Sequence, residues 1–236
     1  MEEPYSFTER FAAWGVHLFS ICGLLVGFLA ILAIGVKDFR TAFGWLIVAQ
    51  FIDGVDGTLA RRFHITRILP QINGKTIDYV IDFSTYAVIP TYFIYSGVLL
   101  PDGAKLPLSF LILLVSAIYY GKEGMVSDDN YFVGFPVMWN MVAFYLYFVL
   151  NAAPAVNALI IIICAVLHFV PLKFAYPSRA RKTRIPTITI TVVLLLLMSL
   201  IVWYFPKEIL VLRLGALLSL SYFAILAIID TFRLTK

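Results

Sequence analysis

The sequence has few charged residues, few cysteines and few histidines. Only 14% of the 236 residues are charged and 61% are hydrophobic, whereas soluble domains contain about 25% charged residues. The two cysteines, Cys22 and Cys164, lie in separate apolar segments without the spacing of a metal or redox motif, so we expect small buried side chains there. The three isolated histidines are interpreted as structural. A soluble core of this size cannot bury so large an apolar excess, and a bilayer must therefore solvate much of the surface.

Several motifs of other protein classes are absent too. The sequence has no Gly-rich phosphate loop and no Ser–His–Asp arrangement. It has no polar domain large enough to bind a duplex, so nucleic-acid binding is not expected. The first residues, Met1-Glu2-Glu3-Pro4, lack the basic start of a signal peptide, and no small-residue cleavage site follows. We therefore expect the first apolar segment to remain in the protein.

Long apolar runs make up most of the chain. A backbone that spans a membrane must satisfy its own hydrogen bonds, which allows helices or a closed barrel, and unbroken runs of about 20 residues favour helices. The sequence thus predicts an all-α fold, a polytopic integral membrane helical bundle of about eight transmembrane helices, with residues 1–236 as a single domain. The expected helices cover roughly 12–36, 39–61, 75–100, 106–124, 134–151, 155–174, 186–205 and 208–230.

Basic residues are unevenly distributed between the two sides of such a bundle. If both termini are cytoplasmic, most of the 18 Lys and Arg residues fall on the cytoplasmic side, as the positive-inside rule requires. That orientation places the loop of residues 61–75, and the aspartates beside it, at the cytoplasmic interface.

Four aspartates flank this loop. Asp53 and Asp56 stand three residues apart near the end of the second apolar run, and Asp78 and Asp82 stand four apart near the start of the third. Each pair lies on one face of its helix, and the short loop makes the two helix ends neighbours. Clustered carboxylates at membrane depth are unfavourable unless something neutralises them. Two hard divalent cations, Mg²⁺ or Mn²⁺, are therefore predicted, in an arrangement suited to phosphoryl transfer.

Small and basic residues surround the aspartates. Gly54, Gly57 and Ala60 follow a small-residue spacing that serves either plain helix packing or the close approach of a flat ligand such as a nucleobase. Gly74 opens the next helix, where its missing side chain would leave room beside a metal or phosphate. Arg61 stands one turn beyond the aspartates, either as a phosphate-binding group or as a topology charge.

This segment resembles the signature of the CDP-alcohol phosphatidyltransferases, D-x-x-D-G-x-x-A-R, a spacer, and G-x-x-x-D-x-x-x-D. Every fixed position of the signature is present between residues 53 and 82. The spacer, residues 62–73, is longer than usual, which affects the shape of the loop and not the aspartates. The resemblance implies a CDP-linked lipid substrate, here CDP-diacylglycerol, from which CMP is the leaving group.

The resemblance also implies roles for individual residues. The two divalent cations, Mn²⁺ or Mg²⁺, would be bound by all four carboxylates, those of Asp53, Asp56, Asp78 and Asp82. Asp82 would in addition be the general base that takes the proton of the acceptor hydroxyl. The CDP- and nucleotide-binding positions would be Gly57, Ala60, Arg61 and Gly74. Members of this family are commonly homodimers, so a homodimer is expected.

The signature leaves the acceptor alcohol open, and the segment 119–140 favours choline. The segment is rich in aromatic and acidic residues, and a quaternary ammonium is bound by aromatic faces and nearby negative charge. The alternative is an interfacial aromatic belt with a solvated acidic loop. Tyr120, Phe132 and Phe135 are further rings of the segment that could supply such faces. The expected choline-binding residues are Tyr119, Glu123, Asp128, Asp129, Tyr131, Trp139 and Asn140.

Three stretches of the chain resemble the bacterial phosphatidylcholine synthases, the branch of this family that uses free choline. They are residues 128–140, residues 169–179, and the opening around Trp14 and His17. The resemblance implies transfer of a phosphatidyl group from CDP-diacylglycerol to choline. It also implies an integral protein of the bacterial inner membrane. The distribution of basic residues places the active site and both termini on its cytoplasmic side.

Other interpretations stay open at this point. The acceptor could be serine, glycerol phosphate or inositol, and a basic cluster near residue 180 could bind an anionic acceptor, the diphosphate or anionic lipids, or could only set the topology. This basic cluster consists of Lys173, Arg179, Arg181, Lys182 and Arg184. A cation-coupled transporter also carries intramembrane acids, but near the bilayer midplane and often with repeats. A non-catalytic scaffold is the third alternative.

Overall fold

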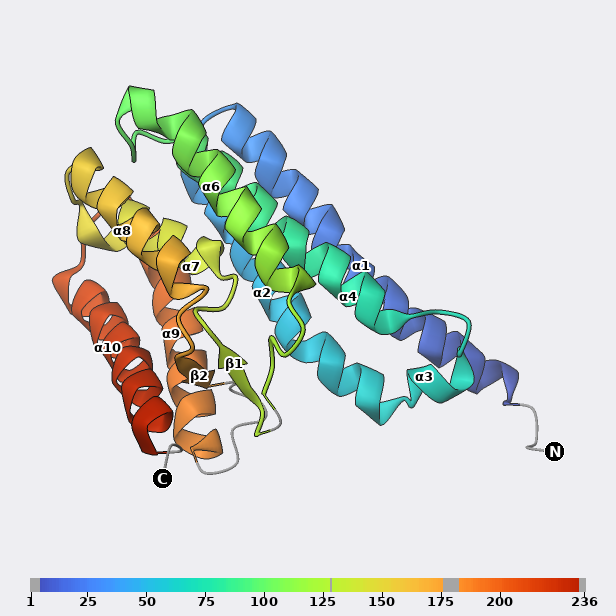
Figure 1. Ribbon diagram of the computed structural model, residues 1–236. Helices are drawn as coiled ribbons and strands as arrows, with labels where there is room; N and C mark the ends of the chain where they lie inside the picture. The colour runs from blue at the N-terminus through green and yellow to red at the C-terminus, as the bar shows by residue number, and fades with distance from the viewer. Residues whose placement is uncertain (1–4, 128, 176–182, 234–236) are drawn as a thin grey trace.

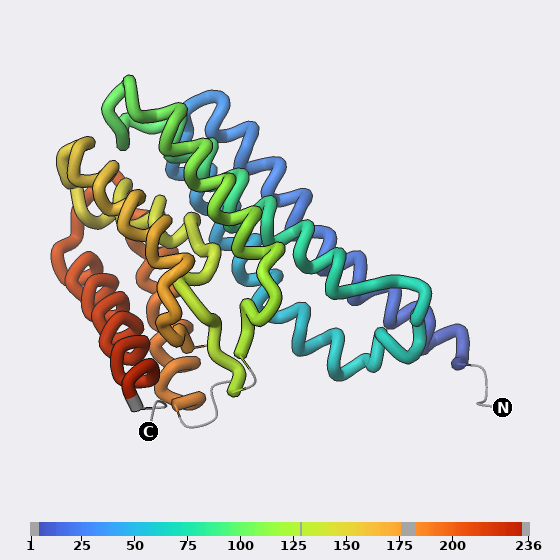
Figure 2. Tube along the Cα trace, viewed as in Figure 1, coloured from blue at the N-terminus to red at the C-terminus, as the bar shows by residue number. Residues whose placement is uncertain are grey.

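A computed structural model describes residues 5–127, 129–175 and 183–233 of the chain. These residues form a helical bundle with one small two-stranded sheet (Figure 1 and Figure 2). Strands β1 (Tyr131–Val133) and β2 (Lys173–Ala175) pair antiparallel. In chain order the helices are α1 (Phe7–Gly35), α2 (Phe39–Arg62), α3 (Ile65–Ile68), α4 (Gly74–Asp82), η1 (Phe83–Val88), α5 (Ile89–Ser96), α6 (Asp102–Gly121), α7 (Trp139–Phe144), η2 (Tyr145–Leu150), α8 (Pro154–Leu167), α9 (Arg184–Tyr204) and α10 (Leu210–Arg233).

Two π-helical turns join helices into longer rods. η1 connects α4 to α5 without a break, and η2 continues α7. With these joins, the described helices follow the order of the apolar runs in the sequence. Among the described helices, α1, α6, α9 and α10 are the four that are long and apolar enough to cross a membrane. The chain is therefore a helical membrane protein with four candidate spans.

Two expected helices are shorter than the apolar runs predicted. The runs indicate helices over 134–151 and 155–174, whereas the structure has helices over 139–150 and 154–167, both shorter than the usual span. Gly134 has a φ of 91°, and a Cβ there would lie 2.2 Å from the His168 carbonyl oxygen. The N–H groups of Gly134 and Phe135 donate to the carbonyls of Leu172 and Leu167 at 2.8 and 2.9 Å. The apolar stretches thus extend beyond the helices into non-helical chain, part of which is exposed, as Phe169 is at 47%.

Glycines bring α1 close to the rod formed by α4, η1 and α5. A Cβ added at Gly27 would lie 2.8 Å from Cδ1 of Ile89, and one at Gly23 would lie 3.1 Å from Cγ2 of Ile81. The two glycines stand one turn apart, so both lie on the same face of α1. Small residues allow such close approach between membrane helices, where packing rather than hydrophobic exclusion drives association. This contact holds the helix that carries Asp78 and Asp82 against α1.

An aromatic core holds the opposite ends of the same helices together. Phe43 of α2, Phe93 of α5, and Phe144 and Phe148 of α7 and η2 are buried. The centroids of their contacting rings lie between 5.2 and 6.5 Å apart, in edge-to-face, tilted and stacked pairs. Such pairs add to the stability gained by burial. The core therefore fixes α2 relative to α5 and α7, although these helices are far apart in the sequence.

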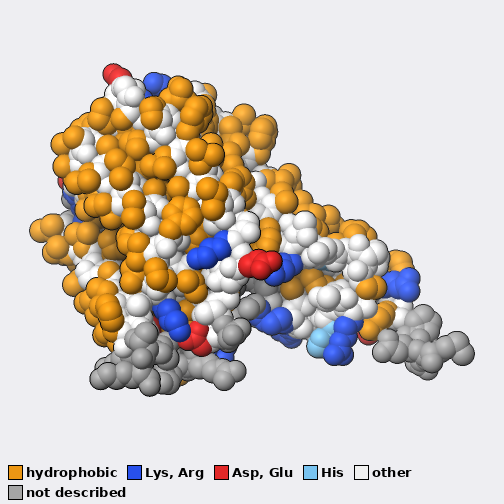
Figure 3. All heavy atoms as spheres, viewed as in Figure 1, with side chains coloured by type: hydrophobic (Ala, Val, Ile, Leu, Met, Phe, Trp, Pro, Cys, Tyr) orange, Lys and Arg blue, Asp and Glu red, His pale blue; other side chains and the backbone are white. Residues whose placement is uncertain are grey.

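The surface is apolar over much of its extent. Figure 3 shows hydrophobic side chains over most of the visible face, while Lys, Arg, Asp and Glu gather toward the lower edge. α1 begins and α10 ends at that lower side (Figure 1). Large side chains such as Phe7, Trp203 and Leu218 are 70% or more exposed. A monomeric soluble protein rarely exposes such area, so this face suits contact with lipid.

Gly27 allows a test of the packing between α1 and the α4–α5 rod. Gly27→Leu places a branched side chain against Ile89 and should lower the free energy of unfolding by about 1–3 kcal/mol, the usual effect of overpacking. Gly15→Leu is the matched control in the same helix, because a Cβ at Gly15 would meet no atom within 4 Å. The measurement is thermal unfolding of the purified protein in detergent. Equal effects at the two positions would contradict the contact.

Candidate functional site

Three of the four aspartates meet where α2 ends and α4 begins. One carboxylate oxygen from each of Asp53, Asp78 and Asp82 lies within 4.8 Å of the other two. The segment between the helices contains only the short helix α3. It ends at Asn73, whose Oδ1 caps α4 by accepting a 3.2 Å hydrogen bond from the Thr76 N–H, as the first turn of a helix requires. The expected convergence of the two helix ends is therefore present.

Asp56 lies apart from this group of three. Three residues advance a helix by about 300°, so Asp56 is rotated by about 60° around α2 from Asp53, whereas Asp78 and Asp82 differ by only about 40°. The Asp56 side chain is 8% exposed and lies beside Ser20 of α1. Asp56 is not one of the three carboxylates gathered within 4.8 Å, although it lies close enough for its charge to act on Asp53 and Asp82. Its role as a metal ligand stays a prediction.

Tyr86 is a member of the site that the sequence interpretation missed. Its hydroxyl donates a 2.6 Å hydrogen bond to Oδ2 of Asp53, and its side chain is buried. It is carried by the wide turn η1, and π-helical turns of this kind are often found at functional sites. Tyr86 follows Asp82 by four residues, as Asp82 follows Asp78. This repeated spacing is the signal that could have identified it.

The cluster has the chemistry of a site for a hard divalent cation. Neither Asp53 nor Asp82 forms an ion pair with a described Lys or Arg, since the ion pairs among described residues lie elsewhere. Oδ1 of Asp82 is buried and has no hydrogen-bond partner among the described residues. A buried carboxylate oxygen without a partner is unfavourable, and carboxylate oxygens are the ligands that Mg²⁺ and Mn²⁺ prefer. Asp53, Asp78 and Asp82 can therefore hold a metal ion.

The glycines near the end of α2 face open space, not another helix. A Cβ added at Gly54 would meet no atom within 4 Å, and one at Gly57 would meet only Nη1 of Arg61, at 3.5 Å. Nη2 of the exposed Arg61 donates to Oγ1 of Thr58 at 3.2 Å, so the guanidinium lies along its own helix. Packing among the described residues thus does not account for Gly54 and Gly57. This arrangement favours the approach of a flat ligand.

Gly74 and Ala60 have close neighbours. A Cβ at Gly74 would lie 3.2 Å from Cε1 of His17, so an imidazole takes the space that the missing side chain leaves. His17 is buried and stands edge-on to Trp14. Ala60 packs against a small hydrophobic cluster that joins α1 to the α3 region, formed by Ala13, Val16, Ile65 and Leu69. The expected part of Gly74 and Ala60 in nucleotide binding stays a prediction.

Three of the expected choline-binding residues lie inside the bundle. Tyr119, Trp139 and Asn140 are each 2% exposed or less. The Trp139 ring stacks on His168 with centroids 5.3 Å apart, and Nδ2 of Asn140 donates to Oε1 of Gln50 at 3.1 Å. These contacts tie α7 to the end of α8 and to α2. They give Trp139 and Asn140 partners within the chain.

The other expected choline-binding residues lie before and within β1. Oδ2 of Asp129 pairs with Nζ of Lys173 at 2.6 Å, and the same ammonium stands 5.8 Å from the centroid of Tyr131. The hydrogen bond from Lys173 holds the pKa of Asp129 below its ordinary value. Glu123 is exposed, and Asp128 lies outside the described residues. Asp129 and Tyr131 thus both interact already with a cation of the chain, the ammonium group of Lys173.

The basic cluster after α8 is only partly described. Lys173 forms the ion pair with Asp129, and Arg184 begins α9. Arg179, Arg181 and Lys182 lie outside the described residues. The expected contact of this cluster with a diphosphate or with lipids stays a prediction.

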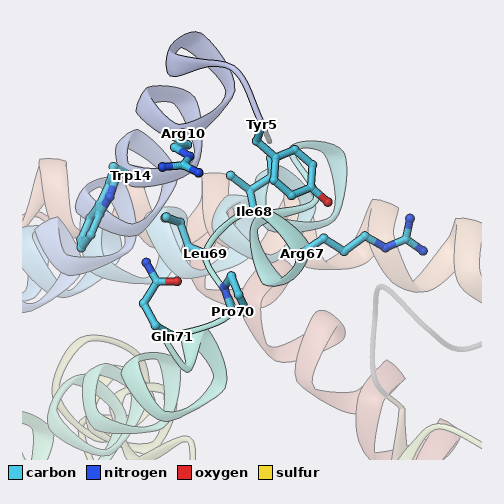
Figure 4. A pocket seen from close by; sticks show the side chains of 8 residues that line it. All are labelled: Tyr5, Arg10, Trp14, Arg67, Ile68, Leu69, Pro70 and Gln71. Carbon is cyan, nitrogen blue, oxygen red and sulfur yellow. The ribbon is translucent and has the colours of Figure 1, made fainter. Parts of the chain in front are cut away.

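A separate surface pocket lies beside the first turns of α1 (Figure 4). Its volume is about 380 Å³. Figure 4 shows Arg10 and Trp14 on α1 opposite the segment Leu69–Gln71, with Tyr5 and Arg67 farther along the rim. None of the four aspartates lines this pocket. The pocket is therefore distinct from the carboxylate cluster.

Tyr86 allows a test of the metal site that needs no substrate. Tyr86→Phe removes the hydroxyl that orients Asp53 and should weaken Mn²⁺ binding about 10-fold, the lower end of the range for groups that support metal ligands. Bound Mn²⁺ is measured by electron paramagnetic resonance of the purified protein. Tyr92→Phe is the matched control, because Tyr92 is 37% exposed on α5. Equal Mn²⁺ affinity in the two variants would show that the Tyr86–Asp53 bond does not serve the metal site.

The chain is similar to curated proteins that share one name. It is 38% identical over 196 residues to the phosphatidylcholine synthase of Pseudomonas aeruginosa, which covers 83% of this chain and 82% of that protein. The phosphatidylcholine synthase of Borreliella burgdorferi is 34% identical over 181 residues, 77% of each chain. That of Rhizobium meliloti is 34% identical over 181 residues, 77% of this chain and 73% of that protein. No family model matches the chain. The identity extends over most of the compared chains and accompanies the gathered aspartates, and the chain belongs to the phosphatidylcholine synthase family.

Proposed function

We propose that this chain is a membrane enzyme that transfers the phosphatidyl group of CDP-diacylglycerol to choline and releases CMP. The observation that carries the proposal is the gathering of Asp53, Asp78 and Asp82 within 4.8 Å at the junction of α2 and α4. The relatives named phosphatidylcholine synthase support the choice of choline.

Asp82 is the general base of the proposed reaction. Its Oδ1, which has no described partner, takes the proton of the choline hydroxyl as that oxygen attacks the phosphorus that carries the lipid. A bond forms between the choline oxygen and this phosphorus, the bond from the phosphorus to the CMP oxygen breaks, and CMP leaves. The hydrogen bond from Tyr86 keeps Asp53 oriented toward the same point. Two Mn²⁺ or Mg²⁺ ions, bound by these carboxylates together with Asp56, would neutralise the diphosphate.

The nucleotide is proposed to lie along the open face of α2. Gly57 has no helix packed against it among the described residues, so a cytosine ring can approach the backbone there. The exposed Arg61 stands one turn further along and can turn from Thr58 toward a phosphate. Ala60 and Gly74 complete the proposed nucleotide-binding set.

The proposal includes an arrangement in the membrane. About eight helical segments would cross a bacterial inner membrane. Two of them are shorter than the usual span: α7 with η2, which is largely buried, and α8, which exposes apolar side chains. The positions of the start of α1 and the end of α10 on one side (Figure 1) support an even number of crossings. The basic loops favour the cytoplasm for that side and for the active site. The enzyme is proposed to act as a homodimer.

A direct assay tests the acceptor. Purified protein receives CDP-diacylglycerol together with choline, serine, glycerol phosphate or inositol in separate reactions, and the lipid product and CMP are measured. We expect phosphatidylcholine and CMP in equal amounts with choline, and no product with the other three alcohols. Product with another alcohol and none with choline would contradict the proposed acceptor. Vesicle uptake of a solute without any chemistry would indicate a transporter.

Asp82→Asn tests the proposed base. Asparagine keeps the shape of the side chain but cannot accept the proton, so kcat should fall at least about 100-fold, the usual minimum contribution of a general base. Binding of CDP-diacylglycerol should persist, as measured with labelled lipid. Asp102→Asn is the control, because the side chain of Asp102 is 96% exposed and pairs with Lys105. Full activity of Asp82→Asn would refute the mechanism.

A further inference from the structure

The proposed reaction limits where the charged end of the acceptor can lie. The acceptor hydroxyl must come within about 3 Å of the base that takes its proton. Two carbon atoms separate this oxygen from the nitrogen of choline, so the two atoms lie within about 4 Å of each other at ordinary bond lengths. A ring that holds the ammonium must lie within about 6 Å of it. The ring therefore belongs to the immediate surroundings of Asp82.

Three aromatic rings contact one another near the carboxylate cluster. Phe83 directly follows Asp82, and Tyr120 of α6 contacts it edge-on at a centroid distance of 5.8 Å. Tyr120 also contacts Tyr79, at 5.7 Å. All three carboxylates of the cluster lie close enough to Tyr120 for their charges to act on its phenol. The three rings are partly exposed, so a ligand can reach them.

Two of the candidate rings, those of Tyr79 and Tyr131, already face a cation of the chain. Nζ of Lys75 stands 5.3 Å from the centroid of Tyr79, and Nζ of Lys173 stands 5.8 Å from the centroid of Tyr131. A ring face that attracts an ammonium group of the protein is less available to an ammonium group of the substrate, because the two cations repel each other. Tyr79 and Tyr131 are therefore weaker choices than Tyr120 and Phe83.

The deeper rings of segment 119–140 are closed to a ligand by burial. Tyr119 is 1% exposed and Trp139 is 0% exposed, and His168 covers a face of Trp139. Exposing either ring to a ligand would require the packing between α6, α7 and α8 to change. Tyr120, the direct neighbour of Tyr119 in the chain, is partly exposed, although the rings of Tyr79 and Phe83 meet it edge-on.

We propose that the trimethylammonium group of the acceptor is held by the rings of Tyr120 and Phe83, beside Asp82. The two ring planes meet at 81°, so they form two walls of a corner next to the carboxylates. A quaternary ammonium has no N–H donor, and ring faces and negative charge are the groups that bind it. An uncharged alcohol such as inositol gains nothing from this corner. The inference rests on the proposed function and adds the residues that select its acceptor.

The test compares choline with an uncharged molecule of the same shape. Purified full-length enzyme is assayed with CDP-diacylglycerol and either choline or 3,3-dimethylbutan-1-ol, in which carbon replaces the nitrogen. Tyr120→Leu and Phe83→Leu should each raise the KM for choline between about 5-fold and about 30-fold, the range of a cation–π contact. The KM for CDP-diacylglycerol and the rate with the uncharged alcohol should stay near the wild-type values. Tyr120→Phe, which keeps the ring, should stay near wild type with choline.

Matched variants separate recognition from folding. Tyr92→Leu removes an exposed tyrosine of α5 and should leave all constants unchanged. If Tyr120→Leu fails to fold, Tyr120 is replaced by phenylalanine that carries one to three fluorine atoms on its ring. These replacements keep the shape of the ring and weaken the attraction of its face for a cation. The KM for choline should then rise stepwise with fluorination, while the KM for the uncharged alcohol does not.

Each other outcome is informative. A wild-type enzyme that makes no product from choline refutes the proposed function and the ring assignment together. A wild-type enzyme that uses choline, with Leu variants that leave its KM unchanged, overturns the ring assignment alone. Equal losses with choline and the uncharged alcohol overturn it as well, because they indicate a structural role. A selective loss in Tyr131→Leu, with Tyr120 and Phe83 variants unaffected, would place the ammonium at β1.

Discussion

The mutual repulsion of carboxylates in an apolar bundle is the constraint on which this structure depends. Asp53, Asp78 and Asp82 lie within 4.8 Å of one another, in a protein whose surface is largely apolar. Charges of one sign repel more strongly where the surrounding dielectric is low, so the helices that carry them must be held together by other contacts. The glycine contacts of α1 hold α4, and the phenylalanine core holds α2 to α5 and α7. The rest of the fold thus keeps together carboxylates that would otherwise move apart, and a cation bound between them would offset their repulsion.

Much of this arrangement can be predicted from the sequence, because it depends on local patterns. Apolar runs give the order of the helices, and the spacing of the aspartates gives two acidic helix ends that a short loop makes neighbours. The prediction is less accurate wherever the answer depends on rotation about a helix axis. Asp56 belongs to the same motif as Asp53 but faces Ser20 of α1. Tyr86 lies outside the motif and nevertheless contacts Asp53.

Apolar composition also overstates helix length. The stretches around Gly134 and Pro171 are as hydrophobic as the neighbouring helices, yet they form a turn and two short strands that bond to each other. Apolar side chains occur in non-helical chain as well as in a membrane helix, and a single sequence does not distinguish the two. The pairing of residues 131–133 with residues 173–175 is a contact between distant segments, which no local pattern encodes.

The prediction of function from local sequence patterns is limited in the same way, as the aromatic and acidic residues of segment 119–140 show. Residue type alone makes Asp129, Tyr131 and Trp139 attractive partners for a cation, and the resemblance to choline-using enzymes adds weight. In the structure, Lys173 forms an ion pair with Asp129, and its ammonium group lies over the ring of Tyr131. His168 stacks on the ring of Trp139. A ring whose face already lies against a cation or a stacked ring of the chain is therefore less available to a substrate than a ring without such a partner. Tyr120 has the same residue type as its neighbour Tyr119. It lies beside the carboxylates, is partly exposed, and has no cation over its face among the described residues. These differences are the reason for proposing it as the ring that binds the substrate.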